Sequence, residues 1–174
     1  MSHLTPAVSE SDHRQGPDDA PVTLVEYGDY ECPSCGRAHP IVKEAQRRLG
    51  SKLRFVFRNF PLSEQHPHAV RAAEAAEAAG GQGKFWEMHD LLFEHQEALD
   101  DAELVRYAAL LEIDVEQFRR ELAAGMYTDR VRKDYGSGLR SGVNGTPTFF
   151  INGVRYDGSW DLESLVEALG EQSG

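Results

Sequence analysis

Cysteine is scarce in this sequence, which has two such residues among 174. Long apolar runs are missing: none approaches the roughly 20 residues of a transmembrane helix, so membrane insertion is not expected. Positively charged residues are also few: there are 18 lysines and arginines against 29 acidic residues, and the formal net charge is −11. A phosphate backbone requires clustered positive charge, so nucleic acid is not an expected partner.

The first 20 residues contain no apolar core that could act as a secretory signal, and we therefore expect a cytoplasmic location. Residues 1–20 are polar with few apolar anchors, so they are predicted to be a loosely ordered tail, with structure beginning near Pro21. The whole chain has the composition of an ordinary soluble globular protein, with 40% apolar and 27% charged residues. Its length suits one domain.

A βαβ unit is predicted after this tail. Residues 22–27 are a short β-prone run, and residues 53–57 alternate as a second strand. Between them, apolar residues recur at helical spacing up to Gly50, which marks the end of the helix. Strands joined in this way are parallel, with a right-handed crossover. Both cysteines then lie at the carboxyl end of the first strand, where α/β sheets position their chemistry.

The middle of the chain, residues 64–138, has a helical pattern throughout. Asp101 and Asp114 are expected to be the N-caps of two of its helices, and a last helix is expected to begin near Thr128. The segment is interpreted as an insertion, because the β segments on either side of it are each too small to fold alone.

The end of the chain returns to β structure. Asn152-Gly153 lies between two strand-forming segments and is the strongest short-range hairpin signal, and a closing helix follows. The predicted fold class is therefore α/β, with βαβ and ββα parts. Residues 21–63 and 139–170 form the sheet domain, and residues 64–138 form the helical insertion.

Both cysteines belong to the stretch VEYGDYECPSC, residues 25–35. Three interpretations are open: a redox pair, half of a metal site, or two inert buried thiols. In a reducing compartment two cysteines are more often catalytic, redox-active or metal-binding than a permanent disulfide.

A helix that begins at this motif would activate the first thiol. Cys32 then lies near the N-cap and Pro33 takes the first helical position, which proline favours. The Cys32 sulfur faces the backbone N–H groups of Ser34 and Cys35 at the positive end of the helix dipole, and both effects favour the nucleophilic thiolate. The i, i+3 spacing places the β-carbons roughly 5–6 Å apart, close enough for a disulfide after slight adjustment. Cys35, one turn farther in, is expected to be more buried and to remain a thiol.

Acidic residues surround the pair. Glu26 lies six residues before Cys32 in an otherwise apolar strand. We expect its carboxyl group to be desolvated, with a raised pKa that suits a proton acceptor for the Cys35 thiol. The alternative is that strand alternation turns Glu26 to solvent. The charges of Asp29 and Glu31 oppose the helix dipole, so the sequence predicts a moderately activated Cys32.

Several motifs occur together in a fixed order. Glu26 precedes CPSC (residues 32–35) at a strand-to-helix junction, an all-helical segment follows, and GTPT (residues 145–148) opens a β-hairpin. With these features the chain, over about residues 20–170, resembles thioredoxin-fold proteins of the DsbA-like class. The resemblance implies a thioredoxin fold with a helical insertion and the activity of a protein disulfide oxidoreductase.

The resemblance also implies roles for individual residues. Cys32 attacks a disulfide and Cys35 resolves the mixed disulfide. Pro147 is cis and packs against the redox pair, and the backbone of Thr146 pairs with an extended substrate.

Pro33 and Ser34, between the cysteines, complete the expected substrate-binding residues. The strongly oxidising periplasmic member of the class typically has Pro-His at these positions, so oxidation, reduction and isomerisation of disulfides are all open. The expected partners are protein or peptide thiols and disulfides, together with glutathione or a thioredoxin system that resets the cysteines.

Two other functions are compatible with the sequence. Cys32, Cys35 and His39 have plausible zinc-ligand spacing, and His66 and His68 could complete the set. A closed site usually needs a second compact ligand pair, which His-Pro-His is poorly shaped to supply, so no metal or cofactor is predicted. A chaperone-like module could instead bind peptides on its helical segment, although the aromatic residues there are more typical of a core.

Overall fold

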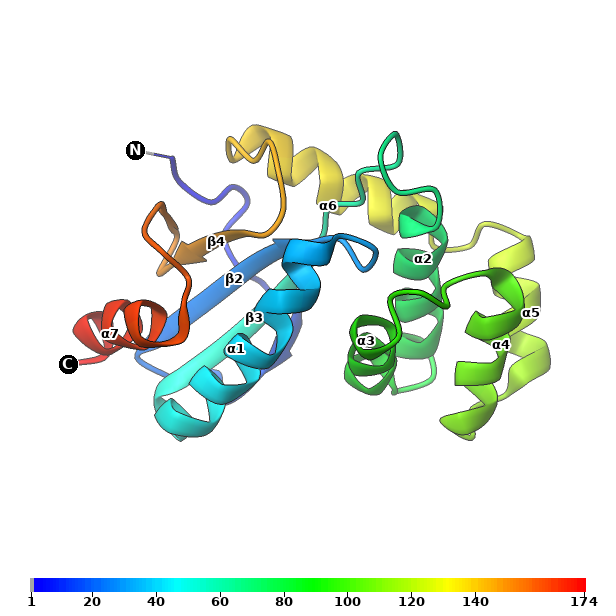
Figure 1. The fold of residues 1–174 in the computed structure, drawn as a ribbon, viewed down its shortest axis with the longest axis horizontal. Coiled ribbons are helices and arrows are strands. Elements are labelled where there is room, and N and C mark those ends of the chain that lie inside the picture. The colour runs from blue at the N-terminus through cyan, green and yellow to red at the C-terminus, as the bar shows by residue number, and fades with distance from the viewer. Residues whose placement is uncertain (1) are drawn as a thin grey trace.

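The computed structural model describes residues 2–174 and contains a five-stranded sheet flanked by helices (Figure 1). The elements are β1 (His13–Gln15), β2 (Val22–Gly28), α1 (Pro33–Leu49), β3 (Leu53–Asn59), α2 (Ala69–Gly80), α3 (Phe85–Glu94), α4 (Asp101–Leu110), α5 (Val115–Ala123), α6 (Thr128–Arg140), β4 (Thr148–Ile151), β5 (Val154–Tyr156) and α7 (Leu162–Ser173). The strand order is β1-β3-β2-β4-β5. Strands β2 and β3 are parallel, and the other neighbours are antiparallel. The predicted α/β fold class is confirmed, with its βαβ unit and closing hairpin.

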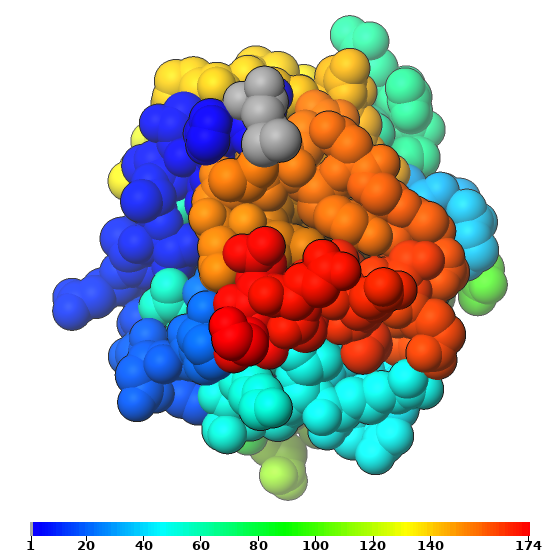
Figure 2. Space-filling view, turned by 90° about the vertical axis from the view of Figure 1, so that its left-hand side faces the viewer, coloured from blue at the N-terminus to red at the C-terminus, as the bar shows by residue number. Residues whose placement is uncertain are grey.

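Helices and the N-terminal segment cover both faces of the sheet. Side chains alternate along β2, so Leu24 packs in the cluster that contains residues of α1 and α7, whereas Val25 and Tyr27 belong to a second cluster. Figure 2 shows α7 (red) lying across the end of the molecule between the β4–β5 hairpin (orange) and α1 (cyan). Glu26 shares the parity of Leu24 and is therefore enclosed under the helices, with 2% of its surface exposed.

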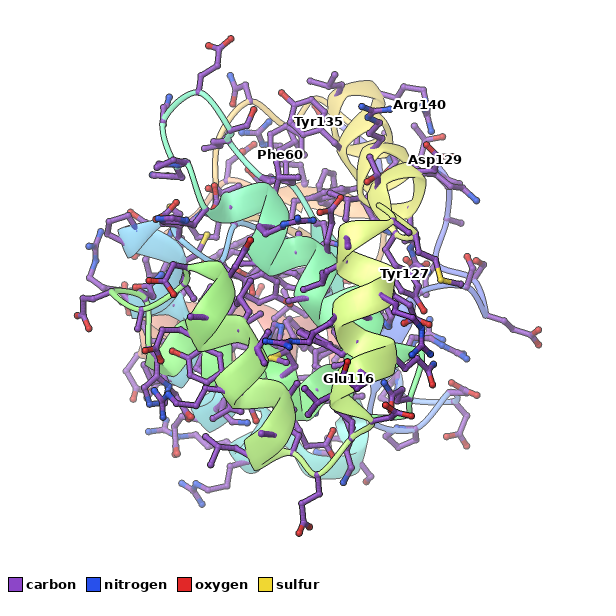
Figure 3. The ribbon with its side chains drawn as sticks, turned by 90° about the vertical axis from the view of Figure 1, so that its right-hand side faces the viewer. Phe60, Glu116, Tyr127, Asp129, Tyr135 and Arg140 are labelled. Atoms are coloured by element: carbon purple, nitrogen blue, oxygen red, sulfur yellow. The ribbon has the colours of Figure 1, made fainter. Side chains whose placement is uncertain are left out.

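The helical segment stands beside the sheet, and α6 returns along it toward β4 (Figure 1). Tyr135 of α6 stacks on Phe60, just after β3, with ring centroids 4.3 Å apart (Figure 3). Asp114 caps α5 as predicted, but the N-cap of α4 is Asp100 and not Asp101. Asp100 has the extended backbone that a cap requires and its carboxylate accepts from the Glu103 N–H, whereas Asp101 is already helical. None of the helices within residues 2–174 has the length and apolar character needed to cross a membrane.

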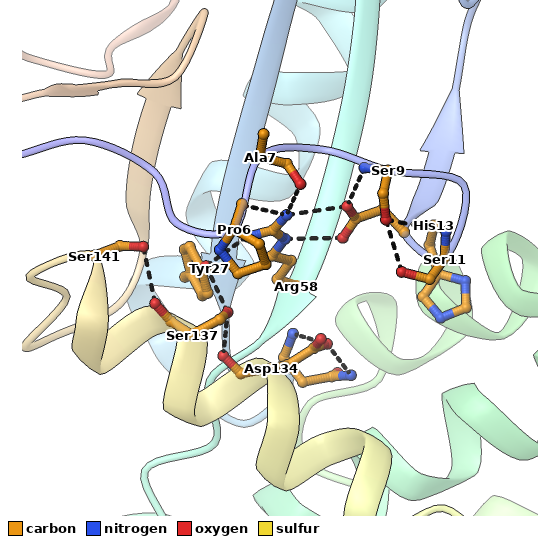
Figure 4. Close-up of polar contacts among 12 residues, drawn as sticks. Pro6, Ala7, Ser9, Ser11, His13, Tyr27, Arg58, Asp134, Ser137 and Ser141 are labelled. Carbon is orange, nitrogen blue, oxygen red and sulfur yellow. Dashed lines mark hydrogen bonds and ion pairs between the residues drawn. The ribbon is translucent and has the colours of Figure 1, made fainter.

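Ordered structure begins earlier than the sequence predicts, because β1 lies at His13–Gln15 and pairs with β3. The buried Arg58 of β3 anchors the segment that precedes β1 (Figure 4). Its guanidinium donates to both carboxylate oxygens of Asp12, at 2.8 and 3.0 Å, and to the carbonyl oxygen of Pro6 at 3.0 Å. A buried cation requires such acceptors, and this segment supplies them. The division of the remaining chain into a sheet domain and an insertion stays a prediction.

Candidate active site

The two cysteines lie where β2 passes into α1. Cys32 is the N-cap of α1 and Pro33 holds its first position, as predicted. Both thiols are free and buried, and the two cysteines come within 3.7 Å of each other. The strand end and the rigid first turn of the helix therefore hold two sulfurs at a separation from which a disulfide forms with little movement.

The pKa of Cys32 is lowered from 9.0 to about 5. The largest cause is the hydrogen bond from the Cys35 thiol, and burial opposes it. The Thr146 side chain and the backbone N–H groups of Cys35 and Ser34 add to the stabilisation of the thiolate. The sulfur does not make a full cap hydrogen bond, however, so the amides act mainly as dipoles directed at it.

This activation is stronger than the moderate value expected from the nearby acids, because those acids are engaged elsewhere. The buried Asp29 carboxylate accepts from the backbone N–H groups of Glu31 and Leu62 and contacts Nδ1 of His66 at 2.8 Å. The Glu31 carboxylate accepts from the backbone N–H of His68. Donors compensate both charges locally, so little of their field acts on the sulfur.

Cys35 and Glu26 are the two buried groups of the site whose pKa values are raised. Burial raises the pKa of the Cys35 thiol well above 9.0, with further contributions from Cys32 and from Glu26. Burial also raises the pKa of Glu26 to about 8, and the charge of Cys32 adds to the effect. The expectation that Glu26 is desolvated is confirmed, and the alternative that it faces solvent is wrong. A buried carboxyl group with this pKa can exchange a proton near neutral pH.

The loop before β4 completes the site from the far end of the chain. The Thr146–Pro147 peptide bond is cis. In its thiol form, Sγ of Cys32 donates to the carbonyl oxygen of Thr146 at 3.6 Å. The Thr146 hydroxyl is buried and has no hydrogen-bond partner among residues 2–174. Pro33 is exposed, and Ser34 is half-buried and accepts from Arg37. Cys32 is only 6% exposed, so a substrate would reach it beside Pro33 and Ser34.

Gln96, between α3 and α4, is a residue of the site that the sequence analysis missed. Its side-chain amide donates to the carbonyl oxygens of Tyr30 and Cys32, at 2.9 and 2.8 Å, and so holds the loop that leads into the redox pair. A β-carbon on Gly36 would lie 2.0 Å from Oε1 of Gln96. In the sequence, the only sign of this contact is Gly36 in the first turn of α1. Glycine weakens a helix, so its presence there indicates that another group packs closely against the backbone.

The zinc set considered from the sequence does not assemble. His66 bonds to Asp29, and His39 instead joins His89 and Asp90 in the one group of potential metal ligands found within residues 2–174. The ligand atoms of this group lie within 4.8 Å of one another. Nζ of Lys43 is 2.8 Å from Asp90, so an ammonium already neutralises the single anionic ligand. The cluster is poorly suited to a divalent cation.

The aromatic residues of the helical segment do not line a peptide groove. Phe85 and Phe93 are buried in the main core, and Trp86 packs against it. The surface considered for a chaperone-like module is therefore interior packing.

Comparisons of sequence give relatives that carry a much longer chain. The protein is 49% identical over 166 residues to a Na(+)/H(+) antiporter NhaA 1 of Salinispora arenicola, covering 95% of this chain and 25% of that protein. It is 46% identical over 171 residues to a Na(+)/H(+) antiporter NhaA 1 of Mycobacterium sp. (strain KMS), covering 97% of this chain and 28% of that protein. The chain thus spans about a quarter of the length of the curated relatives it matches.

Comparisons of structure give proteins of similar length. Oxidised BdbD from Bacillus subtilis superimposes with a TM-score of 0.85 and 26% identity, covering 99% of this chain and 97% of that one. A thioredoxin-like oxidoreductase from Silicibacter pomeroyi DSS-3 has a TM-score of 0.82 and 28% identity, covering 94% and 92%. The structural neighbours include DsbA-like thiol-disulfide oxidoreductases.

A family comparison agrees with the fold. The family described as Thioredoxin matches residues 8–171, which is nearly the whole chain. The protein therefore belongs to the thioredoxin family, and its fold is that of the DsbA-like thiol-disulfide oxidoreductases.

Proposed function

We propose that this protein exchanges disulfides with protein or peptide substrates, with Cys32 as the nucleophile and Cys35 as the resolving thiol. The observation that carries the proposal is the opposite perturbation of two neighbouring thiols. The pKa of Cys32 is lowered to about 5, whereas that of Cys35 is raised well above 9.0. At neutral pH the first sulfur is a thiolate that can attack, and the second keeps its proton until a mixed disulfide forms.

Two exchange steps follow from this assignment. The Cys32 thiolate attacks a substrate disulfide, forming a mixed disulfide and releasing one substrate thiolate. The mixed disulfide removes the Cys32 charge that helps to keep Glu26 protonated, so Glu26 can release its proton and its carboxylate can then take the proton of Cys35. Cys35 attacks Cys32, forming the Cys32–Cys35 disulfide and releasing the second substrate thiolate. Each step breaks one S–S bond and forms another. The same steps in reverse donate the disulfide to a substrate dithiol.

The substrate would lie beside the redox pair. The cis Thr146–Pro147 loop contacts Cys32 through the Thr146 carbonyl, and Pro33 and Ser34 are the accessible residues next to it. An extended peptide that pairs with the Thr146 backbone would place its sulfur at Cys32. Glutathione or a thioredoxin system is the proposed partner for resetting the cysteines, and the cytoplasmic location stays a prediction.

The pKa of Cys32 supports one direction of exchange. A thiolate that is stabilised in the reduced protein makes the reduced form more favourable and the disulfide a stronger oxidant. Disulfide donation is therefore the proposed direction. The test is to equilibrate the protein with glutathione buffers. A couple more oxidising than glutathione supports donation, and a couple more reducing than glutathione contradicts it.

The exchange itself can be tested with three proteins. We expect the wild type to catalyse reduction of insulin by dithiothreitol. Cys32→Ala should lose this activity, and Cys35→Ser should instead accumulate a mixed disulfide at Cys32. If Cys32→Ala retains the activity, the thiols are not the site of turnover and the function proposed here is wrong. Retained binding of an unfolded, cysteine-free peptide by all three proteins would instead indicate a chaperone-like module.

A further inference from the structure

A small polar cavity lies behind the redox pair, between β2 and the helices α1 and α3. Its wall includes Glu26, His39, Lys43, His89 and Asp90. The cavity leaves about 10 Å³ for the centre of a water molecule, which is roughly the space that a single water requires. Val42 and Phe55 also line it, but the charged, imidazole and amide side chains of the wall supply the polarity that a buried water needs.

Two buried polar groups on this wall lack partners. Oε2 of Glu26 and Nε2 of His39 are enclosed and make no hydrogen bond to the described residues. An unpaired buried polar group costs about 1–3 kcal/mol, so such groups are normally satisfied by protein or by ordered water. Glu26 comes from the sheet and His39 from α1, and the cavity between them is the common feature. A water there can bond to both side chains.

The route continues from His39 toward solvent. Nε2 of His39 lies 3.5 Å from Oδ1 of Asp90, and the Asp90 side chain is 30% exposed. Oδ2 of Asp90 accepts from Nζ of Lys43 at 2.8 Å, and Lys43 is itself exposed. Glu26 is fully enclosed at the other end, where its charge couples to Cys32 and Cys35. A chain of proton-carrying groups thus connects the interior carboxyl group with the surface at Asp90.

We propose that this cavity holds one water molecule that bridges Glu26 to His39, and that His39 and Asp90 carry the proton of Cys35 between Glu26 and solvent. Once the mixed disulfide has removed the Cys32 charge, Glu26 first releases its own proton through the water to His39 and Asp90. When Cys35 attacks the mixed disulfide, its proton passes to the Glu26 carboxylate and the S–S bond to the substrate is exchanged for the Cys32–Cys35 bond. The net change is one proton passed from Cys35 to solvent, with Glu26 protonated before and after the step. No electron moves along this route. The inference rests on the proposed function, because it needs Cys35 to give up a proton.

The groups around His39 favour a neutral imidazole that relays protons over an imidazole that stays protonated. The titratable groups that face it are Glu26 from β2, Lys43 from its own helix, and His89 and Asp90 from α3. Burial lowers the pKa of His39, with Lys43 acting in the same direction and Asp90 against it. His39 is therefore neutral at rest. It can accept a proton from the water and pass it on to Asp90, because a neutral imidazole has one nitrogen free to accept.

The test measures the release of substrate thiol from the Cys32 mixed disulfide by stopped flow, from pH 5 to 9, in the wild type, His39→Leu and His39→Gln. Leucine fills the space without a polar group, whereas glutamine keeps a hydrogen bond to the water but carries no proton. We expect both variants to slow the resolving step by about tenfold or more. We also expect their rates, unlike that of the wild type, to rise with the concentration of a small imidazole buffer. The exposed His68→Gln is the matched control and should behave as the wild type.

The possible outcomes separate the two proposals. Wild-type rate and pH profile in both His39 variants would overturn the relay, and so would full recovery in His39→Gln, which would show that His39 supplies only a hydrogen bond and carries no proton. A crystal structure without water between Glu26 and His39 would overturn the bridge. If the wild type releases no thiol, or Cys35→Ser releases it equally fast, the proposed function fails instead.

Discussion

Sγ of Cys32 lies 3.6 Å from the backbone carbonyl oxygen of Thr146, although 114 residues separate them in the chain. The contact brings the start of α1 together with the loop before β4. The thiol can donate to this carbonyl. The Thr146 hydroxyl is buried without another partner among residues 2–174, and it can donate to the thiolate that replaces the thiol. One residue can thus serve both protonation states of the nucleophile.

Removal of that hydroxyl should weaken the thiolate. In Thr146→Val we expect the pKa of Cys32 to rise by about one to two, because a hydrogen bond to a charged group contributes about 1.5–3 kcal/mol. The measurement is the ultraviolet absorbance of the thiolate as a function of pH in the reduced protein. Thr23→Val is the control, because it removes a threonine hydroxyl near the start of β2, the end of the strand farther from the cysteines. Equal pKa values in the two variants would contradict the role of the Thr146 hydroxyl.

Glu26 should make the fold less stable as pH rises. Burial, with a smaller contribution from Cys32, raises its pKa from 4.5 to about 8. Between these values the folded state keeps a proton that the unfolded state releases. This contribution is therefore present in full below pH 4.5 and is lost by about pH 8. The gap between 4.5 and about 8 sets an upper bound of about 5 kcal/mol on the loss.

The thiols must be removed to see this effect. The lowered pKa of Cys32 acts in the opposite sense, because it adds stability as pH rises from about 5 to 9. The free energy of unfolding should therefore be measured in a protein with both cysteines replaced by alanine, with and without Glu26→Gln. Stability should fall more steeply with pH where Glu26 is present, because the other buried acid with a raised pKa, Asp134, is common to both proteins. The difference should be smaller than the upper bound, because Cys32 no longer adds to the shift. Parallel curves would show that Glu26 is not held protonated by the fold.

Gln96 and Gly36 should show a strong coupling. Gly36→Ala places a β-carbon 2.0 Å from Oε1 of Gln96, so the glutamine must move and lose its bonds to Tyr30 and Cys32. Two hydrogen bonds of this kind contribute about 1–3 kcal/mol. Gln96→Ala removes the same bonds, and the double variant should be little worse than Gln96→Ala alone, because alanine is then favourable in the helix. Additive losses in urea unfolding would mean that the two residues act independently.

The Arg58–Asp12 pair should anchor the N-terminal segment. Burial raises the pKa of Asp12, but the hydrogen bond and charge of Arg58 outweigh it, so the net direction is down. Asp12→Ala leaves the Arg58 charge buried, and we expect a loss of about 3–5 kcal/mol in the free energy of unfolding. The stabilisation in the wild type is present above pH 3.8 and is lost as pH falls further.

An exposed pair on the same segment provides the control for Asp12. Arg14 and Asp18 are 2.8 Å apart, and the Asp18 side chain is 74% exposed. Asp18→Ala should cost no more than about 1 kcal/mol, since water already solvates both charges. Equal losses for the two variants in urea unfolding would rule out a special role for the buried pair.

Local patterns in the sequence predicted much of the fold. The apolar run of β2, the proline after Cys32 and the Asn152-Gly153 turn each depend on neighbours within a few residues, and each element lies where it was expected. The cap of α4 was misplaced by one residue, because Asp100 and Asp101 are chemically identical candidates. The sequence analysis missed that the N-terminal segment is ordered, because a polar sequence does not reveal that Arg58, 46 residues from Asp12, is buried and bonds to it.

The sequence by itself determined the chemistry of this protein: two thiols three residues apart at a helix start, with an acid on the preceding strand. The Cys35 thiol, three residues away, is the largest cause of the Cys32 shift, and tertiary structure decided the other contributions. The pKa of Cys32 depends on Thr146, on donors that occupy Asp29 and Glu31, and on burial. The loop around Cys32 depends on Gln96, and the cavity behind Glu26 depends on His39 and α3. Desolvation and hydrogen bonding act over a few ångströms in space, and residues that distant in sequence meet only when the chain has folded.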